Sequence, residues 1–110
     1  MKATFYEEEN HLIVVPTGKL DTINAPEFTK LLQELLAKHP SSCLLDLSQV
    51  SFLSSSGLQA LLTGAKIAKK ENFDFTVFGM KEMVSDVFIM SGFNQFIKSY
   101  ASKEDAFSQS

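Results

Sequence analysis

Apolar positions along the chain fall into two patterns, short continuous runs and longer stretches with helical spacing. The run from Cys43 to Leu47 is too short for a typical helix and is typical of a strand buried on both faces of a sheet. After a serine cluster at positions 54–56, apolar residues recur every three or four positions, which predicts an amphipathic helix ending near Glu71 and Asn72. The apolar face of that helix consists of Leu58, Leu61, Leu62, Ala65 and Ala68. The central stretch is therefore predicted to be a strand, a connection, a serine-rich turn and a helix.

Two apolar stretches near the N-terminus predict a β-hairpin. Residues 3–8, anchored by Phe5, form the first expected strand, and the β-branched run at 12–15 forms the second. The polar residues 9–11 between them are typical of a tight turn. Pro16 has no backbone N–H to donate, so we expect an edge or an irregularity of the sheet at that position.

A second amphipathic helix is predicted after the hairpin. Asn24 is expected to cap its start, with Glu27 three residues later completing a capping box, and Pro26 is tolerated in a first helical turn. The apolar residues that follow have helical spacing: Phe28, Leu31, Leu32, Leu35 and Leu36. Pro40 is expected to end this helix at residue 38 or 39.

The C-terminal third predicts a strand, a helix and two less regular segments. The strand covers residues 73–78, and one of its faces carries Phe73, Phe75 and Val77. The helix ends at Gly92, a suitable C-terminal cap, and its expected core residues are Met83, Val84, Val87 and Phe88. Residues 93–100 fit either a short edge strand or a helical continuation, and residues 104–107 fit a last helical turn before a frayed end.

Strands that alternate with helices predict an α/β fold with parallel pairing and right-handed crossovers. The N-terminal hairpin adds an antiparallel pair, so we expect one domain over residues 1–110 with a mixed sheet of about four or five strands and about four helices. Functional turns in such sheets usually follow the carboxyl ends of parallel strands. The turn at Asp21 and the serine turn at 54–56 should therefore lie on one surface.

Composition narrows the range of functions for this domain. The 110 residues are 45% hydrophobic and 21% charged, as in globular proteins, and the net charge of −3 argues against a nucleic-acid partner. Cys43 is the only cysteine, which excludes an intramolecular disulfide and makes a buried core thiol the expected state. The sequence has neither an apolar run long enough to insert into a membrane nor a secretory signal at its start, so we expect a cytoplasmic protein.

Patterns typical of catalysis and metal binding are missing from the sequence. A serine nucleophile needs a neighbouring base, and the hydrolase elbow pattern fails because Leu53 stands where a glycine is required two residues before Ser55. His11 and His39 are expected at the surface, away from the serine turn. Metal-ligand spacings and glycine-rich nucleotide motifs do not occur either. We therefore expect no enzyme activity, no metal and no cofactor.

The serine cluster supports two interpretations. Serine is a good helix N-cap because its hydroxyl accepts a bond from an unpaired backbone N–H, so the cluster can be a purely structural turn. The same hydroxyls lie at the positive end of a helix, where a phosphate dianion is stabilised. Gly57 has no side chain, so another molecule could approach its backbone closely. Asp21, expected on the same surface, is either a simple turn residue or part of this site.

Several short motifs occur in a fixed order along nearly the whole chain. They are Leu20-Asp21 followed by Ala25-Pro26-Glu27-Phe28, Leu45-Asp46-Leu47-Ser48 with Phe52, Ser55-Ser56-Gly57-Leu58, and the closing Gly92-Phe93 and Glu104-Asp105-Ala106-Phe107. In combination they resemble the STAS domains of bacterial anti-sigma factor antagonists. The resemblance implies a small α/β domain without catalysis of its own, which binds an anti-sigma factor, often a serine kinase, while it is unphosphorylated.

The resemblance also implies a switch and a site. The kinase phosphorylates the serine that begins the Ser-Ser-Gly-Leu motif, here Ser55, which releases the complex, and a phosphatase is implied as a further partner. Asp21 matches the family's acidic residue near this turn. The expected partner-binding surface consists of Asp21, Thr22, Asn24, Ser54, Ser56, Gly57 and Leu58.

One position departs from the family pattern. The family usually has Asp immediately before the modified serine, and this chain has Ser54 there, which makes Ser54 an alternative acceptor. The missing acidic residue keeps a second function open, that of a non-phosphorylated STAS subunit of a membrane transport or lipid-trafficking assembly. A weak homodimer also stays open.

Overall fold

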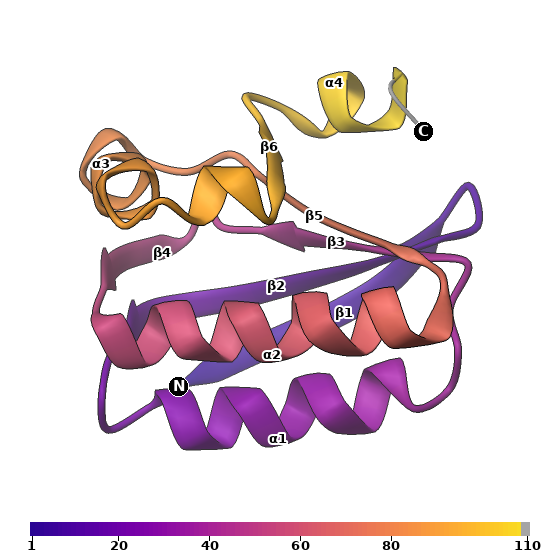
Figure 1. Ribbon diagram of the computed structural model, residues 1–110, viewed down its shortest axis with the longest axis horizontal. Coiled ribbons are helices and arrows are strands. Elements are labelled where there is room, and N and C mark those ends of the chain that lie inside the picture. The colour runs from indigo at the N-terminus through magenta and orange to yellow at the C-terminus, as the bar shows by residue number, and fades with distance from the viewer. Residues whose placement is uncertain (109–110) are drawn as a thin grey trace.

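Strand β2 (His11–Leu20) is the strand around which the rest of the protein is arranged in the computed structural model, which describes residues 1–108 (Figure 1). It pairs with β1 (Lys2–Glu8) on one side and with β3 (Ser42–Asp46) and β4 (Val50–Leu53) on the other. Two more strands, β5 (Asp74–Phe78) and β6 (Lys98–Tyr100), extend the sheet beyond β3. The helical elements are α1 (Ala25–Leu36), α2 (Ser55–Glu71), α3 (Glu82–Met90), the 3-10 turn η1 (Phe93–Gln95) and α4 (Lys103–Ser108).

The predicted mixed α/β architecture is confirmed. The β1–β2 pair is antiparallel and the other pairs among residues 1–108 are parallel, in the order β1-β2-β3-β5-β6 with β4 beside β2. Strand β4 is an addition to the prediction, which treated residues 50–53 as part of a connection. Residues 93–100 combine both expected alternatives, since a single 3-10 turn precedes the edge strand β6.

Strand β2 changes its parallel partner halfway along its length. Residues 12–14 pair with β3, whereas residues 18–20 pair with β4 after an irregularity at Gly18. Pro16 is buried between these two segments, where its missing N–H leaves no ladder bond broken. The expected irregularity is therefore present, and it carries the end of β2 past β3 to the start of α2.

Helices α1 and α2 lie side by side across one face of the sheet (Figure 1). The core between them and the sheet includes Phe28, Leu32, Leu36, Leu45, Leu47, Leu61 and Val77. The short helix α4 packs on the opposite face, where a smaller apolar cluster holds Ile13, Leu44, Phe78 and Ala106. The apolar periods read from the sequence therefore mark the faces that α1 and α2 bury.

Two expected core residues lie at the surface instead. Met83 is 71% exposed, because α3 is short and buries only Val84 and Phe88 completely, while Val87 is partly buried against the same cluster. Phe5 is 51% exposed rather than anchored in the core, because β1 is an edge strand. Gly92 does end α3, with a backbone φ of 79° that suits glycine.

Candidate functional site

The ends of β2 and β4 bring two turns into contact at one edge of the sheet. Because the two strands run in parallel, the turn after Leu20 and the turn after Leu53 leave the sheet in the same direction. The backbone N–H of Ser54 donates to the carbonyl of Leu20 at 3.0 Å, and the hydroxyls of Thr22 and Ser56 lie 3.3 Å apart. The expected common surface is therefore formed, from residues 34 positions apart in the sequence.

Ser54 uses its side chain to hold the start of α2. Its Oγ accepts a hydrogen bond from the backbone N–H of Gly57 at 3.2 Å, with the extended backbone typical of an N-cap. The same hydroxyl donates to the carbonyl of Leu20 at 3.3 Å, so both of its hydrogen-bonding roles are filled. The N-cap predicted for the serine cluster is confirmed at Ser54.

The next two serines differ from Ser54 in what their hydroxyls contact. Ser55 is exposed at the first position of α2, and within residues 1–108 its hydroxyl has no hydrogen-bond partner. Ser56 is partly buried and shares its bond with Thr22. Of the three serines in the turn, Ser55 has the hydroxyl most open to another molecule.

Gly57 and Leu58 shape the turn but present no side chain to a partner. A Cβ at Gly57 would lie 2.3 Å from the carbonyl oxygen of Leu20 and 2.9 Å from Cδ1 of Leu53, so only glycine fits this close approach of α2 to β2. Leu58 is buried in the core. Gly57 and Leu58 therefore do not belong to the predicted partner surface, although they hold the turn that carries it in place.

The start of α1 differs from the predicted capping box. Asn24 makes no side-chain cap, because its Oδ1 accepts from the N-terminal ammonium of Met1 at 3.2 Å and its Nδ2 donates to the carbonyl of Lys19 at 2.9 Å. The expected capping box with Glu27 is therefore wrong. Asp21 closes this turn instead, since its Oδ1 accepts the backbone N–H of Asn24 at 3.0 Å and its carbonyl accepts that of Ala25 at 2.8 Å. Asp21 is thus a turn residue whose second carboxylate oxygen makes no hydrogen bond within residues 1–108.

Apolar side chains surround the two turns, and sequence analysis missed them. Ile23 is 85% exposed between Asp21 and α1, and Phe52 is 45% exposed just before the serine turn. Helix α3, which carries the exposed Met83, packs against β4 at the same end of the molecule (Figure 1). The signal in the sequence is an isoleucine standing alone within a polar turn. This edge of the sheet therefore combines a free hydroxyl, a carboxylate and exposed apolar area.

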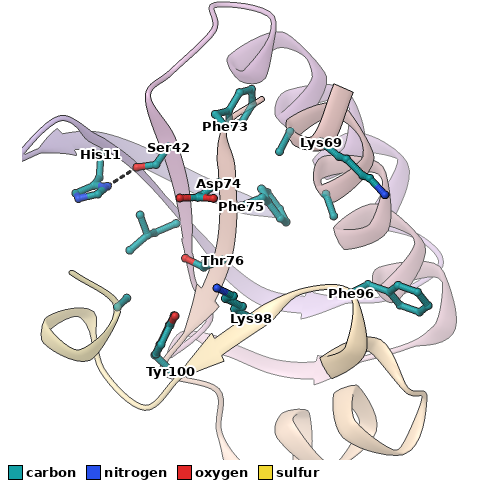
Figure 2. A pocket seen from close by; sticks show the side chains of 14 residues that line it. His11, Ser42, Lys69, Phe73, Asp74, Phe75, Thr76, Phe96, Lys98 and Tyr100 are labelled. Atoms are coloured by element: carbon teal, nitrogen blue, oxygen red, sulfur yellow. Dashed lines mark hydrogen bonds between the residues drawn. The ribbon is translucent and has the colours of Figure 1, made fainter. Parts of the chain in front are cut away.

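The histidines lie at the other end of the sheet. His11 Nδ1 is hydrogen-bonded to the Ser42 hydroxyl. Both residues line a cavity of about 270 Å³, which Asp74 and Lys98 also line (Figure 2). His39 lies 3.6 Å from a carboxylate oxygen of Glu71, at the ends of α1 and α2. No imidazole therefore reaches the serine turn in the described part of the chain.

The remaining candidate groups are structural. Burial raises the pKa of the Cys43 thiol to about 12, so it is a neutral core residue as expected. Asp46 accepts the backbone N–H of Ser48 at 3.0 Å at the end of β3. Residues 1–108 hold no cluster of three side chains suited to a metal ion, and no helix among them is long and apolar enough to cross a membrane.

Comparison with known proteins identifies the class to which this fold and site belong. The STAS domain family matches residues 2–106, so the chain belongs to the STAS domain family. An anti-sigma-B factor antagonist of Listeria monocytogenes is 22% identical over 91 residues, which cover 83% of this chain and 80% of that protein.

Solved structures with the same fold include other antagonists. One is an anti-sigma factor antagonist from Mycobacterium paratuberculosis, with a TM-score of 0.90 at 23% identity over 98% of this chain and 92% of that one. Another is the Bacillus cell fate determinant SpoIIAA in its phosphorylated form, with a TM-score of 0.72 at 14% identity over 98% of each chain. At these identities the structural likeness establishes the fold.

Proposed function

We propose that this protein is an anti-sigma factor antagonist that binds an anti-sigma factor with serine kinase activity, and that phosphorylation of Ser55 ends the complex. The observation that carries the proposal is the exposed, unbonded hydroxyl of Ser55 at the start of α2. The name of the Listeria relative and the phosphorylated form of a structural neighbour support the same direction. A phosphatase that restores the hydroxyl completes the proposed cycle.

Ser55 is a better acceptor than Ser54 for a geometric reason. A kinase must place the attacking hydroxyl in line with the γ-phosphate, which requires that the hydroxyl leave its bonds within the protein. Ser54 would have to give up its bonds to Gly57 and Leu20, which hold α2 against β2. The hydroxyl of Ser55 would give up no hydrogen bond within residues 1–108. The departure from the family's acidic residue therefore does not move the acceptor to Ser54.

The proposed switch works through charge rather than through a change of backbone. A phosphate adds about −1.5 to −2 charges at neutral pH. At Ser55 it would lie at the same edge of the sheet as the exposed Ile23 and Phe52, whose burial by a partner would then require desolvating a dianion. The cap at Ser54 and the close approach at Gly57 can stay unchanged. Binding is therefore expected to be lost while the fold is kept.

The acceptor can be identified directly. The protein is incubated with the candidate anti-sigma kinase and ATP, and the phosphate is located by peptide mass spectrometry. We expect modification at Ser55, retained in Ser54→Ala and Ser56→Ala and lost in Ser55→Ala. The neighbouring alanine variants are matched controls, because each removes one hydroxyl from the same turn. A phosphate found on Ser54, or a chain left unmodified, contradicts the proposal.

One observation favours a second function. Ser54 stands where the family usually has an acidic residue before the modified serine. This replacement is consistent with a STAS subunit that is not a kinase substrate. In that case the same turn would dock on a membrane transport or lipid-trafficking assembly. Affinity purification at native abundance separates the two, because the first function predicts a kinase-type anti-sigma factor and the second predicts a transport ATPase subunit.

A further inference from the structure

Strand β1 is the uncovered edge of the sheet. It pairs with β2 on one side only, and it extends over seven residues from Lys2 to Glu8. Phe5 and Tyr6, at its centre, are 51% and 40% exposed on opposite faces of the sheet. An exposed edge strand of this length is a template for pairing with another strand, and charged residues determine which strand can join.

The hairpin turn determines which backbone groups of β1 point outward. Glu9 and Asn10 both have positive φ, as in a two-residue type I′ turn, which makes Glu8 and His11 a hydrogen-bonded pair. Such pairs alternate along an antiparallel ladder. The N–H and C=O groups of the intervening residues, Ala3, Phe5 and Glu7, therefore point away from β2 and stand free at the edge.

A second copy of the chain matches this edge in one register. If two β1 strands pair antiparallel about a two-fold axis at Phe5, all of β1 is paired and Lys2 lies opposite Glu8 of the second copy. The Phe5 rings then meet across the axis. Moving the axis to Thr4 or Tyr6 shortens the paired stretch and separates Lys2 from Glu8.

Helix α1 supports the same axis independently. It borders β1, with Ala3 beside its first half and Phe5 beside Leu35 in its second half. A helix rises 1.5 Å per residue and a strand about 3.3 Å, so the step from Ala3 to Phe5 spans about four helical residues, and Phe5 lies near the C-terminal end of α1. The exposed charges on the side of α1 that borders β1, continuing one turn past its end, alternate as Glu27, Lys30, Glu34 and Lys38.

The two-fold axis would place two copies of α1 antiparallel above the joined strands. Because Phe5 lies beside Leu35, the axis passes near the C-terminal end of α1, and Glu34 then lies close to Lys38 of the second copy. Strand and helix thus give complementary charges about one axis, although their sequences are separate. We propose that the β1 edge with the adjoining side of α1 is a self-association surface, and that its partner is a second copy of this chain.

The proposed dimer leaves the serine turns free. The C-terminal ends of β2 and β4 point along the strand direction, so the antiparallel arrangement places one serine turn at each end of the joined sheet. Self-association and partner binding can therefore coexist. The proposal does not depend on phosphorylation, and Ser55→Glu should dimerise as the unmodified chain does.

Sedimentation velocity over roughly 10 µM to 1 mM protein tests the proposal, a range suited to a small interface. We expect a concentration-dependent dimer. Phe5→Arg, which places two cations on the axis, should weaken it at least about tenfold. Phe96→Arg is the matched control, because Phe96 is also exposed but lies two residues before β6, the edge strand opposite β1.

A charge exchange tests the register itself. Lys2→Glu should weaken the dimer several-fold, and Lys2→Glu combined with Glu8→Lys should restore it. Glu8 also binds Lys103 at 3.1 Å, so thermal unfolding of each variant monitors the loss of that ion pair separately. A chain that stays monomeric throughout, a dimer that resists Phe5→Arg, or a double variant that stays dissociated overturns the proposal.

Discussion

The two ends of the sheet each hold a serine in a special setting, and the two settings are opposite. At the cavity end, Ser42 has an imidazole partner in His11 (Figure 2) but is buried, with 7% of its surface exposed. Phe107 stacks on the His11 ring. At the turn end, Ser55 is exposed but has no base beside it among residues 1–108. Neither serine combines access with activation, so the accessible one is suited to modification by another enzyme.

The two settings differ because different residues make the structural hydrogen bonds at each end. Ser54 caps α2 and binds the end of β2, which leaves the hydroxyl of Ser55 without a structural role. At the other end Ser42 and His11 satisfy each other between β2 and β3, two strands of the core. The comparison predicts that substitutions at the cavity end change stability alone, whereas phosphorylation of Ser55 changes binding alone.

Adding a methyl group to two glycines of α2 should produce the largest effect. In Gly57→Ala the new Cβ would lie 2.3 Å from the backbone carbonyl oxygen of Leu20 in β2. Because this strand backbone cannot move aside, we expect a loss of about 3 kcal/mol in the free energy of unfolding. In Gly64→Ala the Cβ meets the Phe75 ring at 2.6 Å, and that ring lines the cavity into which it can shift. Thermal unfolding should show a clearly smaller loss at Gly64, and equal losses would contradict this account of the turn.

Removing the Ser42 hydroxyl should produce the next largest effect. Ser42→Ala leaves a ring nitrogen of the partly buried His11 without its partner, which should cost about 1 to 2 kcal/mol of unfolding free energy. Phosphorylation at the serine turn and binding of the anti-sigma factor should stay unchanged, as chemical denaturation and the kinase assay can check. A loss of binding in Ser42→Ala would show that the cavity end affects the serine turn, and would contradict the proposed separation of stability from binding.

Within the serine turn, cap and acceptor should separate cleanly. Ser54→Ala removes the N-cap of α2 and should cost about 1 kcal/mol. Ser55→Ala should change the unfolding free energy by less than about 0.5 kcal/mol, because its hydroxyl is exposed and unbonded. Urea denaturation of both variants side by side measures the difference, and the reverse order of the two losses would be evidence against the assigned roles.

Cys43 should have the smallest effect at neutral pH. Burial raises its pKa from 9.0 to about 12 in the folded protein. The unfolded chain therefore loses the thiol proton first, so this contribution to stability is complete below pH 9 and is lost as the pH rises toward 12. Thermal unfolding at about pH 8 and about pH 10.5 should show the decrease, and Cys43→Val should reduce it. An equally steep decrease in Cys43→Val would assign it to other groups.

Much of the fold follows from local patterns that the sequence displays directly. The buried run at residues 43–47 corresponds to β3 and the residue that follows it, and the serine cluster provides the N-cap of α2 at Ser54. Strand β4 was missed because it has only four residues, two of them exposed, so no alternating pattern stands out. The cap at Asn24 was predicted wrongly because propensity alone could not show that its side chain binds the Met1 ammonium and the Lys19 carbonyl.

The site was predictable in outline but not in its contacts. Parallel strands place Asp21 and the serine turn at one edge, which the order of elements already implies. The bond between Thr22 and Ser56 and the close approach of Gly57 to Leu20 join residues far apart in sequence, so no local pattern encodes them. Exposure of Ile23 and Met83 likewise depends on where α1 and α3 pack.

The affinity of one partner for two forms of this protein tests the central claim most directly. Isothermal titration of the anti-sigma factor against unmodified chain, chain phosphorylated at Ser55 and Ser55→Ala gives three dissociation constants. The account predicts equal affinity for the unmodified chain and Ser55→Ala, and binding at least about 100-fold weaker, or about 2.7 kcal/mol, for the phosphorylated chain. Equal affinity of all three forms would contradict it.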